Sequence, residues 1–412
     1  MAEWQEVGIA EIAAPTSNAL ATGPFGSSIS SVHFRDSGIP VLRGGNLSSD
    51  SEIRLRDEGL VFLAPEKAAE FSKSTVRAGD LVFTCWGTVD QVGLIDDSAQ
   101  HDRYVISNKQ MKATVDSRRA DSEFLYYLFS GDELQRRILG QSIGSSIPGF
   151  NLGQLKALRF RLPPLGEQRA IAAALTEVDD LGAALDALIE KKRAIKTATM
   201  QRLLTGRQRL AGFSGEWEIV RLGEIGTFSK GRGIRRSDVQ SSGLPCVRYG
   251  ELYTAHTDII REFVSFISPE VAAVAQPLRP GDILFAGSGE TKEEIGISAA
   301  YVGAEEAYAG GDIVILSPWR QDSGFLGYLL NSPTVQSQKA SFAQGDAVVH
   351  ISARNLAKIV VDLPSLDEQR AIASILNDMD AELAALAARR EKTRQIKRGL
   401  MQELLTGRTR LV

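Results

Sequence analysis

A gap-free internal repeat constrains this chain more than any other feature of its sequence. Residues 162–210 align with residues 363–411 at a constant offset of 201, and 29 of the 49 aligned positions are identical. Such identity without an insertion indicates two copies of one structural element. A long helix requires a constant length of this kind, because one inserted residue rotates everything beyond it by about 100°.

Start and stop signals bracket a helix in both copies. The second copy opens with Pro364-Ser365-Leu366-Asp367-Glu368, which contains the Ser-x-x-Glu pattern of a capping box. The first opens with Pro163-Pro164, and Glu167 follows near the positive helix end. Both copies end at Thr-Gly, where Gly206 and Gly407 suit a left-handed cap. About 39 helical residues, at roughly 1.5 Å each, predict a helix on the order of 58 Å long.

Apolar residues recur at alternating spacings of three and four within each copy, which is typical of a coiled-coil seam. A helix of this length is too long to bury such a stripe on its own domain, so we expect the two copies to pair as an antiparallel coiled coil. The alternative is two separate helices, each lying on its own domain. The predicted helix-pairing residues are Ile171, Leu175, Val178, Leu181, Leu185, Leu188, Ile195, Ile372, Leu376, Met379, Leu383, Leu386, Ile396 and Leu400.

The segments outside the copies, the variable domains of residues 1–161 and 208–362, are related only loosely. Both contain short β-branched or aromatic runs bounded by Gly, Pro, Asp and Ser, which predict strands and turns. We expect an α+β protein in which two α/β domains, each with a small and mostly antiparallel sheet or partial barrel, are separated by the two long helices in a pseudo-twofold internal repeat. The predicted helical elements occupy residues 162–207 and 363–412. Shorter helices are expected at Phe124–Leu139 and Phe325–Lys339.

Composition excludes several classes of protein. No run of apolar residues is long enough to cross a membrane, and the acidic N-terminus lacks a secretory apolar region. The two cysteines and four histidines stand apart, which argues against a disulfide framework, a metal site or histidine catalysis and fits a reducing compartment, the cytoplasm. The net charge of −4 argues against a non-specific coat on nucleic acid, but leaves room for a basic face that reads specific DNA.

No catalytic motif is present. The run Gly287-Ser288-Gly289-Glu290-Thr291-Lys292 lacks the Gly-Lys-Ser/Thr of a phosphate loop, and Gly231-Arg232-Gly233 lacks the third glycine of a dinucleotide site. There is no His-Glu-x-x-His. The tetrapeptide with which aminomethyltransferases hold a flipped base is also missing. We therefore expect a non-catalytic protein.

Positive charge concentrates in Lys230-Gly231-Arg232-Gly233-Ile234-Arg235-Arg236, at the start of the second variable domain. Such a loop can bring guanidinium groups to phosphates or to guanine edges, although it could equally be a solvated loop. The first domain has Thr22-Gly23-Pro24-Phe25-Gly26-Ser27-Ser28 at that position. Arg43 and Arg248 occupy equivalent places, which predicts either a shared DNA role or a shared structural pair. The predicted DNA-binding residues are Arg43, Lys109, Lys112, Lys230, Arg232, Arg235, Arg236, Arg248 and Lys292, with Lys339 and Arg354 as weaker candidates.

The order of these features resembles the specificity subunit of type I restriction–modification enzymes. The resemblance rests on the repeated Leu-Pro-x-Leu-x-Glu-Gln-Arg-Ala-Ile-Ala after each variable domain and Leu-Leu-Thr-Gly at the end of each helix, and it covers essentially the whole chain. Gly23-Pro24-Phe25-Gly26-Ser27 and Pro280-Gly281-Asp282 also resemble that family's recognition domains. Ser365 replaces the second proline of the motif, and Ala78 replaces the proline of Pro-Gly-Asp.

The resemblance implies that each variable domain is a target-recognition domain that reads one half of a bipartite, asymmetric sequence in double-stranded DNA. The helices would set the spacing between the halves and dock two methyltransferase (M) subunits, which bring S-adenosylmethionine, while this chain would bind no cofactor itself. Endonuclease/translocase (R) subunits would join them for cleavage in phage defence.

Other functions remain open at this stage. The chain could be a DNA-binding adaptor of another methylation or phage-defence assembly, a scaffold that binds no DNA, or a stand-alone methyltransferase.

Overall fold

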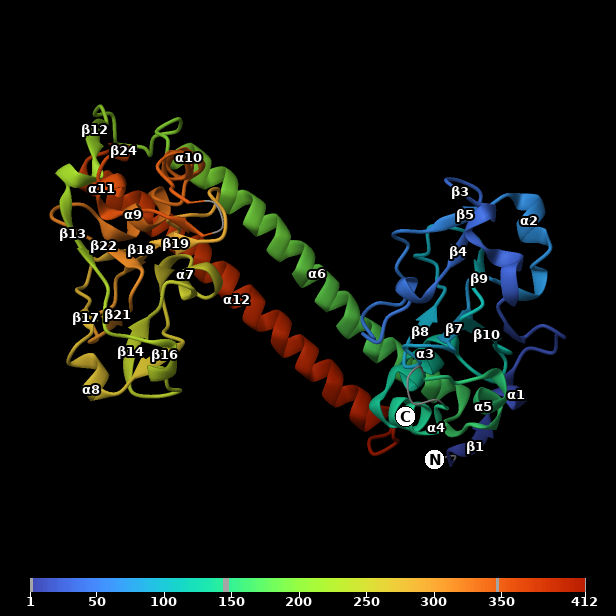
Figure 1. Ribbon diagram of the computed structural model, residues 1–412. Helices are drawn as coiled ribbons and strands as arrows, with labels where there is room; N and C mark the ends of the chain where they lie inside the picture. The colour runs from blue at the N-terminus through green and yellow to red at the C-terminus, as the bar shows by residue number, and fades with distance from the viewer. Residues whose placement is uncertain (1–2, 144–147, 346–347, 412) are drawn as a thin grey trace. The chain divides into compact units, whose positions relative to one another are not determined.

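The chain forms two compact units, each of which contains one variable domain and parts of both long helices (Figure 1). The computed structural model describes residues 3–143, 148–345 and 348–411. Unit 1 comprises Met1–Ala187 and Ala388–Val412, and unit 2 comprises Leu188–Ala387. The long helices are α6 (Leu165–Leu203) and α12 (Leu366–Leu404), with 39 residues each, as the repeat predicts. The predicted limits of the variable domains and helical elements stay a prediction, because the compact units divide the chain inside both helices.

One antiparallel sheet, one mixed sheet and a short ribbon form the β-structure of unit 1. One sheet has the order β2-β10-β7-β8 and the other the order β3-β5-β4-β9-β6, while β1 pairs with β11. All pairs are antiparallel except β4–β9. The strands are β1 (Gln5–Gly8), β2 (Leu20–Thr22), β3 (Phe34–Arg35), β4 (Ile39–Leu42), β5 (Val61–Leu63), β6 (Thr75–Val76), β7 (Asp80–Thr84), β8 (Val92–Leu94), β9 (Tyr104–Ile106), β10 (Gln110–Thr114) and β11 (Arg159–Leu162).

Unit 2 repeats this plan with additions. Its sheets have the orders β13-β22-β18-β20-β15 and β16-β14-β21-β17, and two ribbons pair β12 with β24 and β19 with β23. Each domain therefore has two sheets where we expected one small sheet or barrel. The strands are β12 (Glu218–Arg221), β13 (Gly226–Lys230), β14 (Leu244–Val247), β15 (Asp258–Ile260), β16 (Ser265–Ile267), β17 (Gln276–Pro277), β18 (Ile283–Ala286), β19 (Ser288–Gly289), β20 (Ser298–Tyr301), β21 (Tyr308–Ala309), β22 (Ile313–Pro318), β23 (Val349–His350) and β24 (Val360–Leu363).

The shorter helices depart from prediction, because each expected single helix is broken into two. In unit 1, Gly131 adopts an extended conformation between two helices. In unit 2, Ser332 is extended before Pro333, since a residue that precedes proline is disfavoured in a helix. The helices involved are α3 (Ser122–Ser130), α4 (Asp132–Gln141), α9 (Ser323–Leu329) and α10 (Pro333–Ser341). The remaining short helices are α1 (Ile9–Ile12), α2 (Pro65–Ala69), α5 (Leu152–Ala157), α7 (Glu251–Thr254), α8 (Pro269–Ala272) and α11 (Ala353–Leu356).

Each long helix contributes one end to each unit. Ile171 and Leu175, near the start of α6, lie in the core of unit 1 with the aromatic residues of α3. Leu203, at the end of the same helix, lies in the core of unit 2. Helix α12 does the reverse, since Ile372 belongs to the core of unit 2 and Leu404 to that of unit 1. The alternative of two helices lying each on its own domain is therefore wrong.

The glutamate of the repeated Leu-Pro-x-Leu-x-Glu-Gln motif joins the start of one helix to the segment beyond the end of the other. Glu167 accepts a hydrogen bond of 2.6 Å from Arg410 in unit 1, and Glu368 accepts one of the same length from Arg209 in unit 2. The Ser365 hydroxyl accepts from the N–H of Glu368 at 3.4 Å, which is the serine half of the predicted capping box.

The glutamine of the motif attaches each long helix to its variable domain. The side-chain oxygen of Gln168 accepts from the N–H of Asp121, the residue that caps α3, at 2.8 Å. Gln369 makes the same bond to Asp322, the cap of α9, at 2.9 Å. At the far ends of the helices, Gly206 and its counterpart Gly407 are left-handed, with φ of 67° and 72°, as predicted.

Ion pairs hold the helix segments antiparallel within each unit. In unit 1, Asp179 and Asp186 of α6 pair with Lys397 and Arg390 of α12 at 2.6 and 2.9 Å. In unit 2, Lys192 and Lys196 of α6 pair with Glu382 and Asp380 of α12, both at 2.6 Å. Residue numbers rise along one helix as they fall along the other, which confirms the antiparallel pairing.

The predicted apolar seam is only partly buried. Besides Ile171, Leu175, Ile372 and Leu376, which face the cores of the units, only Leu185 of the predicted residues is buried. Leu181, Leu188, Ile195 and Ile396 are 38–49% exposed, so their assignment to a buried seam is wrong. The half-buried predicted residues are Val178, Met379, Leu383, Leu386 and Leu400.

Substitutions on α6 can separate core packing from seam packing. Leu175 is fully buried, whereas Leu181 is 41% exposed. We expect Leu175→Ala to lower the free energy of unfolding of unit 1 by about 2–5 kcal/mol, because it leaves a cavity in the core. Leu181→Ala should change it by less than about 0.5 kcal/mol. Chemical denaturation followed by circular dichroism measures both, and equal losses would support the apolar seam instead.

Candidate nucleic-acid interface

The basic loop of unit 2, residues 230–236, follows strand β13 and is held by its own backbone. The N–H of Gly231 donates to the carbonyl of Ile313 at 2.9 Å, and that of Arg232 donates to the carbonyl of Ala309 at 3.1 Å. A Cβ on Gly231 would lie 1.9 Å from the carbonyl oxygen of Gly310, so only glycine fits there. Gly233 has a φ of 77° and lies against Val274, which fixes the loop at a second point.

This anchored backbone presents the four cations of the loop to solvent. Lys230, Arg232, Arg235 and Arg236 are all exposed. The Lys230 ammonium lies 3.9 Å from Asp312, a separation at which solvent-exposed charges attract only weakly. Exposed guanidinium groups on such a backbone can bind phosphate oxygens or guanine edges.

Unit 1 anchors one glycine at the place of Gly231, but the residues that follow it differ. The N–H of Gly23 donates to the carbonyl of Gln110 at 2.9 Å, and a Cβ on Gly23 would lie 1.8 Å from the Ser107 carbonyl oxygen. These contacts match those of Gly231, so the two glycines occupy equivalent positions. The side chain presented in unit 1 is Phe25, which is 71% exposed. The two units therefore place unlike side chains, one apolar and the others cationic, after an equivalently anchored glycine.

Arg43 and Arg248 are equivalent in structure as well as in sequence. The N–H of Arg43 donates to the side chain of Asn46 at 2.9 Å, and that of Arg248 donates to Glu251 at 3.1 Å. Both guanidinium groups have partners within the protein, namely the Gly59 carbonyl at 3.0 Å and the Glu251 carboxylate at 2.7 Å. These bonds favour the structural pair over the shared DNA role.

The other predicted DNA-binding residues divide by burial. Lys109, Lys292 and Arg354 are exposed. Lys112 is buried, and its ammonium donates to the carbonyl of Thr75 at 2.8 Å. Lys339 is fully buried, and its ammonium donates to the carbonyl of Gly296 at 2.6 Å. Burial removes both lysines from the candidate interface; the sequence missed this because a strand or helix position does not reveal which way a lysine points.

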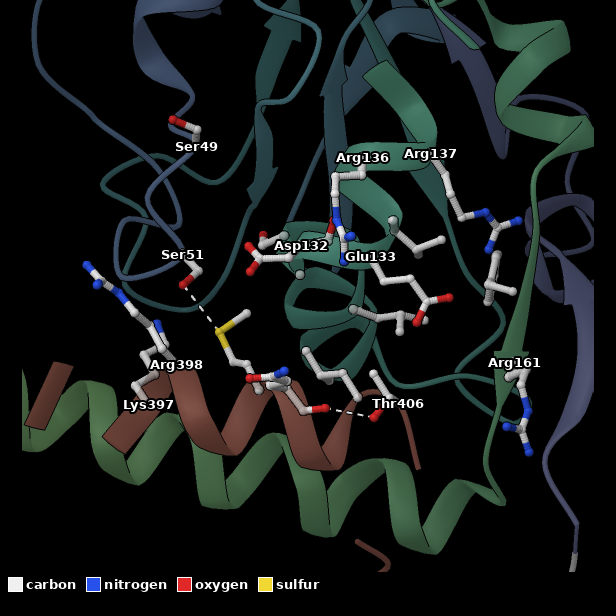
Figure 2. Close-up of a pocket in the computed structure, with 18 of the residues that line it drawn as sticks. Ser49, Ser51, Asp132, Glu133, Arg136, Arg137, Arg161, Lys397, Arg398 and Thr406 are labelled. Atoms are coloured by element: carbon white, nitrogen blue, oxygen red, sulfur yellow. Dashed lines mark hydrogen bonds between the residues drawn. The ribbon is translucent and has the colours of Figure 1, made fainter. Parts of the chain in front are cut away.

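A groove of about 1140 Å³ in unit 1 gathers further cations that the sequence did not connect (Figure 2). It lies between the loop at Ser49–Glu52, helix α4 and the C-terminal part of α12. Arg136 and Arg137 line it from α4, but both donate to backbone carbonyls, those of Asp132 and Arg159. Because these guanidinium groups are already engaged, the groove is a weaker candidate interface than the loop at residues 230–236.

The repeated architecture and its unlike loops define a class of protein. The chain matches the family model described as type I restriction modification DNA specificity domain twice, over residues 26–194 and 214–397. The two matches cover most of the chain, which therefore belongs to this family.

Individual relatives are similar to the chain at lower identity. The type I restriction enzyme MjaVIII specificity subunit of Methanocaldococcus jannaschii is 26% identical over 323 residues, 74% of this chain and 75% of that protein. The type I restriction enzyme EcoKI specificity subunit of Escherichia coli is 24% identical over 199 residues, 46% of this chain and 42% of that protein. These relatives agree with the family match.

Solved structures share the fold. The S subunit of a type I restriction–modification system from M. genitalium superposes with a TM-score of 0.59 at 17% identity, over 97% of this chain and 96% of that one. A chain from work on the assembly and conformational transition of a type I system superposes with a TM-score of 0.56 at 18% identity, over 98% of each chain. In the described part of this chain, no helix is long and apolar enough to span a membrane.

The close approach of Gly231 to Gly310 yields a stability test. We expect Gly231→Ala to lower the free energy of unfolding of unit 2 by about 1–3 kcal/mol, because the added Cβ forces the two backbones apart. Gly311→Ala is the matched control, since nothing lies within 4 Å of its Cβ. Denaturation curves for the two variants should differ; identical curves would mean that the loop is not anchored through Gly231.

Buried Lys339 predicts a pH dependence for unit 2. Burial lowers the pKa of Lys339 to about 7, so the unfolded chain binds more protons than the folded one between about pH 7 and pH 10. The contribution of Lys339 to the free energy of unfolding of unit 2 must then rise with pH between about pH 7 and pH 10. We expect Lys339→Met to flatten the rise, because it removes the titrating ammonium group. Methionine suits this position because the equivalent residue in unit 1 is the apolar Ile138. Denaturation at several pH values measures the slope, and the exposed Lys358→Met serves as control; an unchanged slope in Lys339→Met would contradict the assignment.

Proposed function

We propose that this chain is the DNA-recognition subunit of a type I restriction–modification enzyme, in which each variable domain reads one half of a bipartite, asymmetric target. The observation that carries the proposal is the repeated loop scaffold of Gly23 and Gly231 within a chain of this family. An equivalent glycine anchor that is followed by exposed Phe25 in unit 1 and by exposed arginines in unit 2 suits two readers of unlike sequences.

The basic loop at residues 230–236 supplies the contacts of unit 2 to DNA. Arginine binds the O6 and N7 atoms of guanine through two parallel hydrogen bonds, and both arginine and lysine bind phosphates. In unit 1, exposed Phe25 offers an apolar contact, such as one to a thymine methyl group. Lys109 and Lys292 extend the basic surface of the two units, and Arg43 and Arg248 shape it through their capping bonds.

The paired helices set the spacing between the two half-sites and dock two methyltransferase subunits. Their repeated sequence suits two copies of one partner, whereas the variable domains differ as their targets do. The partners supply S-adenosylmethionine and the methyl transfer, and endonuclease subunits join for cleavage, so this chain itself is non-catalytic and acts in the cytoplasm. A net charge of −4 fits a subunit that shares its DNA affinity with partners.

Substituting the loop arginines in the assembled methyltransferase complex tests the proposal. We expect Arg232→Ala, Arg235→Ala and Arg236→Ala together to weaken DNA binding and to reduce the slope of log affinity against log salt by up to about three, one for each phosphate that is no longer neutralised. Any relaxation of sequence preference should be confined to one half-site. Binding titrations over a salt series measure this, with Lys358→Ala as control. Unchanged affinity and slope would overturn the role of the loop.

Exchanging a domain tests the proposal as a whole. We expect a hybrid chain, in which the corresponding domain of another family member replaces residues 1–161, to change one half of the methylated sequence and leave the other half intact. Sequencing methylated adenines in cells that carry the hybrid measures the result. No change in either half would favour a scaffold that binds no DNA, and methyl transfer by the purified chain alone would revive the enzymatic alternative.

A further inference from the structure

Three elements of unit 1 meet at one buried group of polar side chains. The hydroxyl of Tyr127, on α3 of the variable domain, donates to Asp179 on α6 at 2.7 Å. The other oxygen of Asp179 lies 2.6 Å from the ammonium of Lys397 on α12, and that ammonium also lies 5.3 Å from the centre of the Tyr127 ring. Asp179 therefore joins the variable domain to both long helices at one carboxylate.

Unit 2 repeats this group from equivalent residues. Tyr328 on α9 donates to Asp380 on α12 at 2.7 Å, and Asp380 lies 2.6 Å from Lys196 on α6. The Lys196 ammonium is 5.2 Å from the centre of the Tyr328 ring. All three residues lie at an offset of 201 from their counterparts, so the group belongs to the internal repeat although its tyrosines lie in the variable domains.

An arginine from a loop of each variable domain completes the group. Arg54 donates to the Tyr127 hydroxyl at 3.3 Å and to Thr176 of α6 at 2.9 Å. Arg261 donates to the Tyr328 hydroxyl at 3.2 Å and to Asn377 of α12 at 3.1 Å. Each tyrosine hydroxyl therefore lies between a guanidinium donor and a carboxylate acceptor, with a third polar side chain nearby, Thr176 at 3.2 Å and Asn377 at 3.0 Å.

The burial of these charges indicates that they specify geometry more than they add stability. The Lys397 side chain is 3% exposed and that of Asp179 is 13% exposed. Burial raises the pKa of Asp179 and lowers that of Lys397, although their mutual attraction opposes both shifts. A buried ion pair recovers its desolvation cost only in good geometry, so it disfavours other arrangements of the groups that it joins.

We propose that Tyr127 and Tyr328 are positioning residues, whose hydroxyl groups fix the orientation of each variable domain on the helix pair of its own unit. This inference rests on the proposed function, because a domain that turns on its helices shifts the DNA half-site that it reads. In this arrangement the tyrosines do not touch DNA; they set the spacing between half-sites that the complex accepts.

Removing one hydroxyl tests this inference with little change in packing. In the methyltransferase complex, Tyr127→Phe or Tyr328→Phe should reduce the preference for the native spacer over spacers longer or shorter by one base pair, on the order of tenfold, because the variable domain loses the hydroxyl that binds it to the helix pair. Affinity for the native spacer should fall much less. Titrations with the three DNA duplexes measure the ratio, and thermal denaturation of the free chain reports whether each variant folds.

Buried tyrosines elsewhere in the same domains are the matched controls. Tyr104 donates to Asp57 at 2.7 Å, and Tyr301 donates to the carbonyl of Glu305, both within one variable domain. Tyr104→Phe and Tyr301→Phe should leave the spacer preference unchanged. The inference is overturned if Tyr127→Phe and Tyr328→Phe lose affinity equally for all spacers, or if the ratio of affinities for native and altered spacers stays unchanged. If one of the two variants does not fold, the other alone provides the test.

The wild-type complex separates this inference from the proposed function. Sequence-specific binding with no spacer preference would refute the positioning role alone. Absence of sequence-specific binding would refute the proposed function itself.

Discussion

The pairing of an aspartate on one long helix with a lysine on the other, largely buried in unit 1 and half-buried in unit 2, is the constraint on which the rest of the structure depends. Asp179–Lys397 in unit 1 and Asp380–Lys196 in unit 2 each bring α6 and α12 together within their unit at 2.6 Å. Because a charge without its partner is costly to bury, each pair disfavours other registers of the two helices. The register in turn brings Ile171 and Leu404 into the same core, where they pack with the variable domain.

The repeated sequence motifs correspond to joints between elements. In each motif the glutamate binds an arginine beyond the end of the other helix, and the glutamine accepts from the backbone N–H of the aspartate that caps a helix of the variable domain. A motif that joins three elements tolerates little change in residue type, because each side chain satisfies buried partners. The arrangement lets the variable domains differ in sequence while their attachment to the helices stays the same.

Within the variable domains, too, a constant anchoring point is combined with side chains that differ. Gly23 and Gly231 lock equivalent backbones against a neighbouring carbonyl, and the following residues differ in chemistry. Changing the side chains on such a loop alters what it contacts without altering the fold beneath it. This organisation suits a protein whose targets vary while its assembly does not, and it agrees with membership in the specificity-domain family.

The sequence alone determined the local features: two 39-residue helices, their left-handed glycine caps and the α+β class, because these follow from spacing and from the conformational limits of a few residue types. Only the tertiary structure decided which side chains are buried. Leu181 and Ile195 fit the helical stripe yet are exposed, while Lys112 and Lys339 look like surface cations yet are buried. Burial depends on which elements pack against a position, and those elements come from distant parts of the chain.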